Sequence, residues 1–242
     1  MEEKKKLEIP VYAILGKSGS GKSTVAKMIK DIIDDDEYYS EIRLIKNLDQ
    51  YTTRPQRTKA DTDYTFISRS IFDIIARTDP MDEVIAKGNI ISDISYRTDN
   101  GVWRYIMRHD DLSHIYIHNS QSIVIYVTPV SIGQFMDLHK YYMMSKYSDK
   151  DLILKPIPVL VEANKDKNRL RALYNRASSD SDYKEIIRRE LYGEELPIRF
   201  YEMLESMGYD SVVKIENNYI YGDLRKSVED NLFAHIKSHY GD

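Results

Sequence analysis

Apolar and polar residues alternate along this chain of 242 residues in a way that predicts strands followed by helices. Residues 11–15 are apolar and partly β-branched, as in a buried strand, and residues 41–46 form a second run of this kind. Between the two runs, apolar residues recur at the i, i+3, i+4 and i+7 spacing of one buried helix face: Val25, Met28, Ile29 and Ile32. This order predicts a βαβ unit and therefore an α/β fold.

The middle of the chain predicts a smaller region rich in β-structure. Pro55 rules out a regular helix over residues 49–57, whose polar character predicts a loop. The Asn100-Gly101 pair between two β-rich runs is a strong hairpin signal. The elements expected here are a strand at 64–68, a helix at 70–77, and paired strands at 89–98 and 102–107.

The second half of the chain returns to alternating strands and helices. Residues 122–128 are almost continuously apolar, as in a central parallel strand that is covered on both faces. Pro156 and Pro158 predict that only 159–161 of the run 152–161 forms a central strand. Helices are expected at 131–144, 165–176 and 223–238, the last with Leu224, Val228, Leu232 and Ile236 in register, and a final strand is expected at 211–215.

The segment 16–24, Gly-Lys-Ser-Gly-Ser-Gly-Lys-Ser-Thr, has the spacing of a phosphate-binding loop between a strand and a helix. Its glycines permit positive φ and bring backbone N–H groups close to an anion. Lys22 can reach the β- and γ-phosphates, and the Ser23 hydroxyl can ligate Mg2+. A Gly/Ser-rich turn that matches by chance is the alternative, and the flanking strand and helix disfavour it. The motif therefore predicts ATP with Mg2+ on these residues: Gly16, Ser18, Gly19, Ser20, Gly21, Lys22, Ser23 and Thr24.

Composition narrows the class of protein further. The net charge of -4 argues against a protein that mainly grips nucleic acid through a basic face. The chain has no cysteine, which excludes disulfides, thiol nucleophiles and cysteine-based zinc sites. The N-terminal residues lack a signal-peptide h-region, and no apolar run approaches the ~18 residues of a membrane span. We expect a soluble, cytoplasmic monomer or homodimer with nucleotide substrates and with no nucleic-acid or membrane partner.

Two segments beyond the loop resemble the acceptor-binding segment of guanylate kinases. They are Thr-Thr-Arg-Pro-Gln-Arg at 52–57 and Asp-Tyr-Thr-Phe-Ile-Ser at 63–68, where the family has roughly Thr-Thr-Arg-x-x-Arg and Asp-Tyr-x-Phe-Val-Ser. Residues 159–189 resemble the family's strand, helix and lid, and 211–236 resemble its C-terminal unit. The resemblance implies a P-loop kinase with a central parallel sheet flanked by helices. Its implied parts are a core at 1–48, 118–176 and 209–242, an acceptor-binding β subdomain at 49–117 and a helical lid at 177–208.

The acceptor residues follow partly from their chemistry and partly from the resemblance. Arg54 and Arg57, three apart on a loop, can present planar forks to one phosphate, and Tyr64 can donate a further hydrogen bond. An arginine pair solvated on a surface turn is the alternative. The resemblance assigns Gln50 to the acceptor as well, and makes Tyr105 a second phosphate contact unless it is a core residue of the hairpin.

The lid and the C-terminal unit supply the remaining implied site residues. The resemblance makes Arg176 and Arg188 catalytic together with Lys22 and Arg54, because positive charge offsets the charge that develops on the transferred phosphoryl group. A solvated helix face is the alternative for the lid arginines. The resemblance places Asn217 over the adenine of ATP.

The sequence departs from the family where the acceptor base is read. Ile106 and Met107 stand where the family has Ser or Thr, and Thr128 replaces the acidic residue at a strand end. By the resemblance, the guanine-reading carboxylate would fall near Ser92 or Asp93, and Asp93 can serve only if the hairpin register allows it. Residues 58–63 are shorter than the family's turn and lack its Gly and Glu.

The implied activity is transfer of the γ-phosphoryl group of Mg-ATP to GMP, dGMP or a related acceptor. Such a reaction needs no strong general base, because the attacking phosphate oxygen is already anionic. Two alternatives remain open: a non-catalytic guanylate-kinase-like interaction domain that binds a phosphorylated or acidic peptide, and a kinase of another phosphorylated small molecule such as a ribosyl phosphate. The intact loop with Lys22 favours an enzyme.

Overall fold

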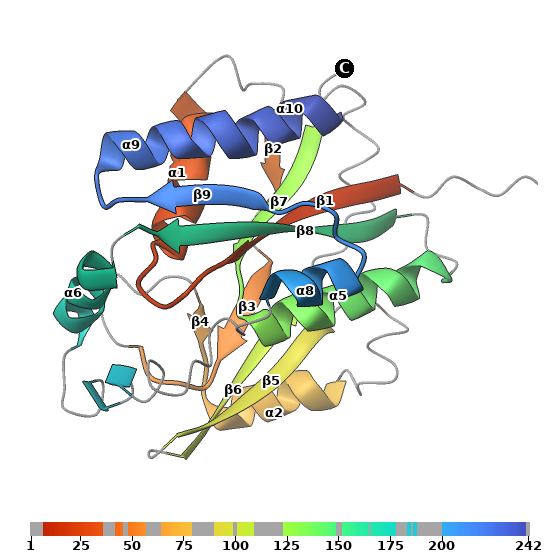
Figure 1. Ribbon diagram of the computed structural model, residues 1–242. Coiled ribbons are helices and arrows are strands. Elements are labelled where there is room, and N and C mark those ends of the chain that lie inside the picture. Colours follow the sequence, from red (N-terminus) through yellow and green to blue (C-terminus); the bar gives the residue numbers. More distant parts are fainter. Residues whose placement is uncertain are drawn as a thin grey trace, which may run out of the picture. The chain divides into compact units, whose positions relative to one another are not determined.

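Figure 1 shows the computed structural model of the chain, whose strands and helices belong to two compact units. The first unit comprises Met1–Val11, Glu41–Thr128 and Gly133–Pro156, and the second comprises Tyr12–Ser40, Pro129–Ile132 and Ile157–Asp242. The structure describes residues 7–35, 42–45, 48–56, 64–78, 90–98, 101–108, 123–148, 152–164, 166–177, 183–184, 186–187 and 200–240.

A five-stranded sheet has the order β2-β7-β1-β8-β9. Its strands are β1 (Leu7–Leu15), β2 (Ile42–Ile45), β7 (Ile123–Pro129), β8 (Leu152–Ala163) and β9 (Val213–Asn217). β2 runs parallel to β7, and β8 runs parallel to β9. From Ile9 to Leu15 every residue of β1 is buried, as expected for a central strand that is covered on both faces. The predicted α/β fold is confirmed.

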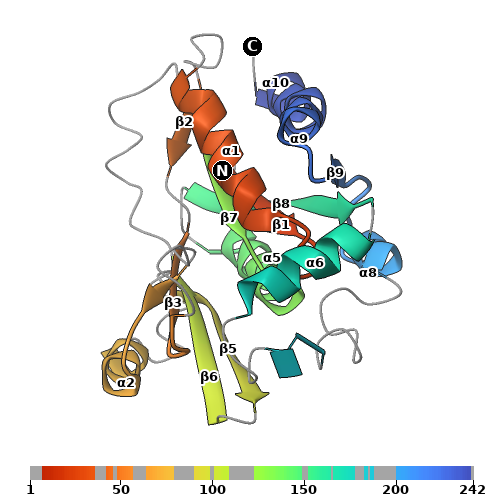
Figure 2. The same cartoon turned by 90° about the vertical axis from the view of Figure 1, so that its left-hand side faces the viewer.

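A four-stranded sheet of order β4-β3-β6-β5 lies within the first unit. It is formed by β3 (Asp49–Thr52), β4 (Thr65–Phe66), β5 (Ile90–Thr98) and β6 (Gly101–Arg108). The hairpin predicted from Asn100-Gly101 is present, since Thr98 pairs with Gly101. Helix α2 (Arg69–Thr78) lies beside this sheet (Figure 2). Its Phe72 is buried in one cluster with Ile90 and Ile106 of the sheet.

Helix α5 (Ile132–Lys146) contacts the same sheet through side chains of its first two turns. A Cβ at Gly133 would lie 3.0 Å from Cδ1 of Ile94, and Ser92 Oγ donates to Asp137 Oδ2 at 2.6 Å. Gln50, Met107 and Ser92 pair in one row across the sheet. Ser92 contacts Asp137 of α5, and side chains in one row share a face. This row therefore faces α5.

Two predictions made from proline were wrong. Residues 49–52 form β3 rather than loop, because backbone pairing with β4 and β6 outweighs their polar character; Pro55 follows the strand's end. β8 is a continuous strand of 12 residues that includes Pro156 and Pro158. Hydrogen-bonded pairing of β8 with β9 begins at Val159, after both prolines. The N–H groups that the prolines lack are therefore not needed for pairing with β9.

In the second unit, the helices present the buried faces that the sequence predicts. α1 (Lys22–Asp35) buries Val25, Met28, Ile29 and Ile32. α6 (Asp166–Arg176) and α8 (Phe200–Ser206) follow along the chain. Within the described part of the chain, no helix is both long enough and apolar enough to cross a membrane.

The closing helix combines three segments that form one continuous rod in Figure 1, drawn in blue. They are α9 (Tyr221–Ser227), the π-helical η2 (Val228–Phe233) and α10 (Ala234–Tyr240). The predicted residues Leu224, Val228, Leu232 and Ile236 are all buried. A repeat of four residues drifts by about 40° per step on an α-helix of 3.6 residues per turn. The wider π turn counteracts this drift and keeps the four side chains on one face.

Candidate active site

The loop between β1 and α1 has the backbone conformation that a phosphate-binding loop requires. Gly19 and Gly21 have φ of 75° and 101°, in the left-handed region that favours glycine. A Cβ at Gly19 would lie 2.7 Å from Cγ of Leu173, and one at Gly21 would lie 2.5 Å from Nδ2 of Asn217. Both positions therefore exclude a side chain on conformational and steric grounds. Gly16 also has positive φ, at 149°.

Lys22 is the first residue of α1, and its ammonium group lies over the loop. Its Nζ donates to the carbonyl of Gly16 at 2.7 Å and to that of Lys17 at 3.2 Å. The N-terminus of a helix carries partial positive charge and N–H groups without helical partners. Lys22, with Ser23 and Thr24 in the same first turn, is therefore placed where an anion is stabilised.

Ser20 supplies an independent sign of a ligand. Its side chain is 1% exposed, and its hydroxyl has no hydrogen-bond partner within the part of the chain that the structure describes. A buried hydroxyl without a partner is costly in a folded protein. A phosphate oxygen in the loop would satisfy it.

The residues present fit a nucleotide with Mg2+. Lys22, the loop amides and the Ser20 hydroxyl would bind phosphate oxygens, and Ser23 would offer a hydroxyl oxygen to the cation. The described residues contain no group of three or more His, Asp or Glu that could hold a metal ion. Magnesium would therefore be held by Ser23 together with oxygens of the nucleotide and water, as is usual for this ion.

Among the predicted acceptor residues, Arg54 occupies a buried position in the first unit. It is 6% exposed, its Nη1 donates to the carbonyl of Pro55 at 3.2 Å, and its guanidinium lies 5.3 Å and 4.9 Å from the ring centroids of Tyr64 and Phe66. The alternative of an arginine solvated on a surface turn does not hold for Arg54. Arg57 lies outside the described residues.

Tyr64 and Tyr105 lie beside Arg54. Their rings meet edge to face at a centroid distance of 5.4 Å, and Tyr105 is 7% exposed. Tyr105 is paired with Thr52 across β3 and β6, and the Thr52 hydroxyl accepts from the backbone N–H of Arg54 at 3.2 Å. The structure thus brings together three of the predicted acceptor residues.

Gln50 is part of a buried neutral network. Its Nε2 donates to Thr128 Oγ1 at 2.8 Å, and its Oε1 accepts from Gln134 Nε2 at 3.2 Å. All three residues are at most 5% exposed. Thr128 stands where the guanylate kinases that the sequence resembles have an acidic residue. In this structure it is a hydrogen-bond partner of Gln50. Its hydroxyl also avoids the cost of a buried charge.

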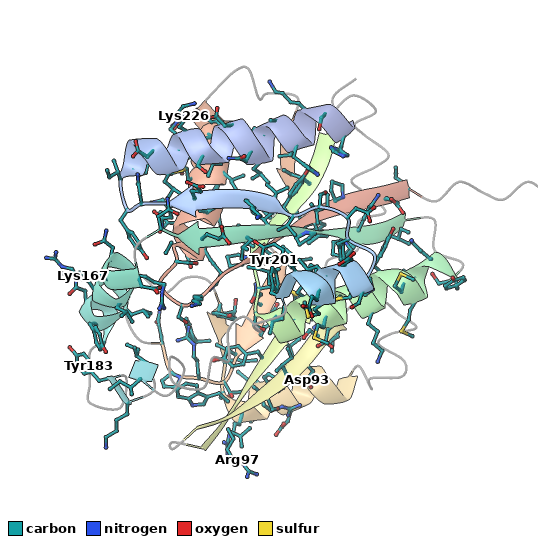
Figure 3. All side chains as sticks on the ribbon, viewed as in Figure 1. Asp93, Arg97, Lys167, Tyr183, Tyr201 and Lys226 are labelled. Atoms are coloured by element: carbon teal, nitrogen blue, oxygen red, sulfur yellow. The ribbon has the colours of Figure 1, made fainter. Side chains whose placement is uncertain are left out.

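Asp93 is not brought together with the other predicted acceptor residues. It pairs with Ile106, which faces α2, whereas the row of Gln50 and Ser92 faces α5. Its carboxylate accepts from Arg104 Nη2 at 2.9 Å, and Arg104 also binds Asp73. Figure 3 shows Asp93 on β5. The hairpin register therefore directs Asp93 away from Tyr105.

Comparison with known proteins leaves the family open. No family model and no curated protein matches the sequence. Among solved structures, a fungal RNA kinase is similar at a TM-score of 0.45 and 11% identity, over 98% of this chain and 88% of that chain. A thymidylate kinase from Ehrlichia chaffeensis is similar at 0.36 and 11%, over 95% of this chain and 99% of that chain. At these TM-scores neither likeness establishes a family or an activity.

Asn217 supports the loop directly. It is 3% exposed, its Nδ2 donates to the carbonyl of Ser20 at 2.7 Å, and its Oδ1 accepts from the backbone N–H of Tyr219 at 2.8 Å. Contact with adenine stays a prediction. What the structure shows is that one end of the Asn217 amide bonds the loop at Ser20 and the other bonds the backbone of Tyr219.

Two residues at the loop were missed by sequence reasoning. Arg169 of α6 is 3% exposed and donates from Nη1 to the carbonyl of Ser18 at 3.1 Å and from Nε to Asp166 at 3.1 Å. The Tyr219 hydroxyl donates to the carbonyl of Gly19 at 2.7 Å. Arg169 lies in a strongly charged helix where the pattern gives no reason to single it out. Tyr219 follows β9, and no local pattern indicates that its hydroxyl reaches the loop.

The lid residues remain predictions. Arg176 is the last residue of α6, and its side chain lies outside the described part, as does all of Arg188. Of the predicted lid at 177–208, the structure describes residue 177, two short helical pieces and the stretch from 200 onward, which includes α8.

Proposed function

We propose that this protein is an ATP-dependent phosphotransferase of the nucleoside monophosphate kinase type, similar to guanylate kinases. It would transfer the γ-phosphoryl group of Mg-ATP to GMP, dGMP or a related phosphorylated acceptor. The loop at 16–24 carries this proposal, because it combines left-handed glycines, a lysine at the start of α1 and a buried hydroxyl that has no partner among the described residues.

The donor half of the reaction rests on the loop. Lys22 would stabilise negative charge on the β- and γ-phosphates, and the loop amides would hold the phosphate chain in one orientation. Bound Mg2+ would neutralise phosphate charge at Ser23. The contribution of these residues is alignment and electrostatic stabilisation rather than proton transfer.

The acceptor half rests on Arg54. A guanidinium that is buried against aromatic rings is poorly hydrated, so its attraction for a phosphate is stronger than that of an exposed arginine. The Tyr64 hydroxyl would donate a hydrogen bond to the same phosphate. Tyr105 would either pack against the Tyr64 ring or donate a second hydrogen bond to the phosphate.

A kinase of another phosphorylated small molecule, such as a ribosyl phosphate, is the second candidate. The pairing of Asp93 with Arg104 favours it, because the carboxylate expected to read guanine is engaged elsewhere. An interaction domain without catalysis is disfavoured by the conformation of the loop, which a binding module of this kind would not need.

A coupled ADP-release assay against a panel of nucleoside monophosphates and sugar phosphates tests the proposal. One acceptor class should give turnover that Lys22→Ala abolishes. Release of ADP that is equal in wild type and Lys22→Ala, or no release with any acceptor, would reject the kinase and favour the interaction domain.

A further inference from the structure

Every backbone carbonyl of the loop from Gly16 to Gly21 accepts a hydrogen bond. Lys22 holds the first two, and the N–H of Val25 donates to the last at 2.9 Å. The three carbonyls between them are each held by a side chain from outside the loop: Ser18 by Arg169 at 3.1 Å, Gly19 by Tyr219 at 2.7 Å and Ser20 by Asn217 at 2.7 Å. We call Arg169, Asn217 and Tyr219 the carbonyl clamp.

The carbonyl clamp fixes where the loop's N–H groups point. In a trans peptide the C=O and the following N–H point in opposite directions, and the described chain has no cis peptide bond. Holding the carbonyl of Ser18 therefore turns the N–H of Gly19 the other way, and holding that of Ser20 does the same for Gly21. A phosphate is attracted by N–H groups and repelled by carbonyl oxygens, so this orientation favours an anion.

Tyr219 locks the peptide group between these two. Its hydroxyl holds the carbonyl of Gly19, while the N–H of the same peptide, that of Ser20, donates to the carbonyl of Lys17 at 3.0 Å. This peptide is thus held at both ends. Without the hydroxyl of Tyr219, one end would be released and the flanking peptide groups could rotate with it.

The backbone of Tyr219 is itself unusual. Its φ of 67° is the one positive value at a non-glycine residue in the part of the chain that the structure describes. Bulky side chains rarely adopt this conformation, and such outliers cluster at functional sites. Burial raises the pKa of the Tyr219 hydroxyl, and the positive charge of Arg169 only partly offsets this rise. The hydroxyl therefore remains a donor at neutral pH.

We propose that the carbonyl clamp, and Tyr219 above all, positions the loop's peptide groups for phosphate binding, an inference that rests on the proposed function of the loop. Tyr219 acts through the backbone and does not itself need to touch the nucleotide. The clamp residues lie far along the chain, on α6, at the end of β9 and just after β9, so the loop's phosphate affinity depends on how these elements hold it.

Tyr219→Phe tests this, because it removes only the hydroxyl. Equilibrium binding of Mg-ATP and of inorganic tripolyphosphate should weaken by the same factor, about three- to tenfold for one lost neutral hydrogen bond. The melting temperature should fall by no more than about 2–4 °C, the cost of one hydrogen bond, since ring and backbone are kept. Tyr221→Phe, at a side chain that is 60% exposed, is the matched control and should change neither.

The two probes separate positioning from other roles. If Tyr219→Phe weakens Mg-ATP but not tripolyphosphate, Tyr219 contacts the nucleoside and the clamp is rejected. If it lowers the melting temperature and leaves both affinities unchanged, its role is structural and the clamp is again rejected.

Lys22→Ala separates this inference from the proposed function. Wild-type binding that Lys22→Ala abolishes but Tyr219→Phe leaves intact would overturn the carbonyl clamp alone. Wild-type protein that binds neither probe in a Lys22-dependent way would overturn both proposals.

Discussion

The loop and the acceptor residues differ in how their geometry is encoded. The loop at 16–24 is one continuous segment, and its glycines and Lys22 have the conformation that their spacing predicts. The acceptor residues come from three strands and a turn, so their arrangement depends on strand register. A local motif specifies its own backbone, whereas a site spread across a sheet is specified by pairing that no local pattern reveals.

The two regions also differ in what surrounds their charged groups. Lys22 is partly exposed and lies against backbone carbonyls, while Arg54 is buried against aromatic rings. The first arrangement suits a phosphate chain that enters with its cation. The second suits one phosphate group that is held by a planar fork.

Lys22→Ala should give the largest effect on the loop side of this comparison. Removing the ammonium eliminates charge stabilisation at the transferred group, for which losses of about a hundredfold or more in turnover are typical. The melting temperature should stay close to wild type, because the side chain is only partly buried. ADP release and thermal unfolding together check this, and a large loss of stability would mean that Lys22 has a structural role.

Gly21→Ala should weaken nucleotide binding less than Lys22→Ala lowers turnover, but it should also destabilise the fold by roughly 1–3 kcal/mol, the cost of a left-handed alanine together with its clash. Gly222→Ala is the matched control, since Gly222 lies in α9 with nothing within 4 Å of an added Cβ. It should stabilise the protein by about 0.5–1 kcal/mol. Urea unfolding measures both, and equal effects would contradict the loop geometry described above.

Arg54→Ala should raise the KM of the acceptor about ten- to a hundredfold, because a charge-assisted pair with phosphate is lost. Affinity for Mg-ATP should not change. Arg54→Lys should recover only part of the loss, since a lysine lacks the planar fork. Arg97→Ala, on the exposed part of β5 in Figure 3, is the control. Equal loss of acceptor and ATP binding would assign Arg54 to a different role.

Lowering the pH should give the smallest effect. Burial, and next the neighbouring His239, lowers the pKa of His235 below its usual value of about 6.5. The unfolded chain then binds more protons than the folded one, so stability is complete above pH ~6.5 and falls as the pH decreases below that value. His235→Gln should flatten part of this slope in melting temperature between pH 7 and 5. An unchanged slope would show that other groups, such as His139, cause it.

The sequence predicted those parts of the fold that have strong periodicity. The buried face of α1 was correct to the residue, the four residues predicted for the closing helix are buried together with Phe233, and the hairpin was correct. β3 and the first half of β8 were missed, because pairing partners outweigh the local effects of polar residues and proline.

The candidate site divides in the same way. Gly16 to Ser23 were recognisable because chemistry and spacing are local. Arg169 and Tyr219 were not recognisable, because they contact the loop from about 150 and about 200 residues further along the chain, respectively. The turn of Asp93 toward Arg104 follows from the register of the hairpin, and the bond of Gln50 to Thr128 joins strands of two different sheets, so no local pattern reveals either contact.

Transfer of labelled phosphate tests the central claim most directly. Wild type and Lys22→Ala would be incubated with ATP labelled at the γ-phosphate, Mg2+ and the acceptor panel, and the products separated and identified. We predict label in a phosphorylated acceptor with wild type alone. Label that appears only as inorganic phosphate, or not at all, would contradict the account, because the loop would then serve hydrolysis or binding rather than transfer.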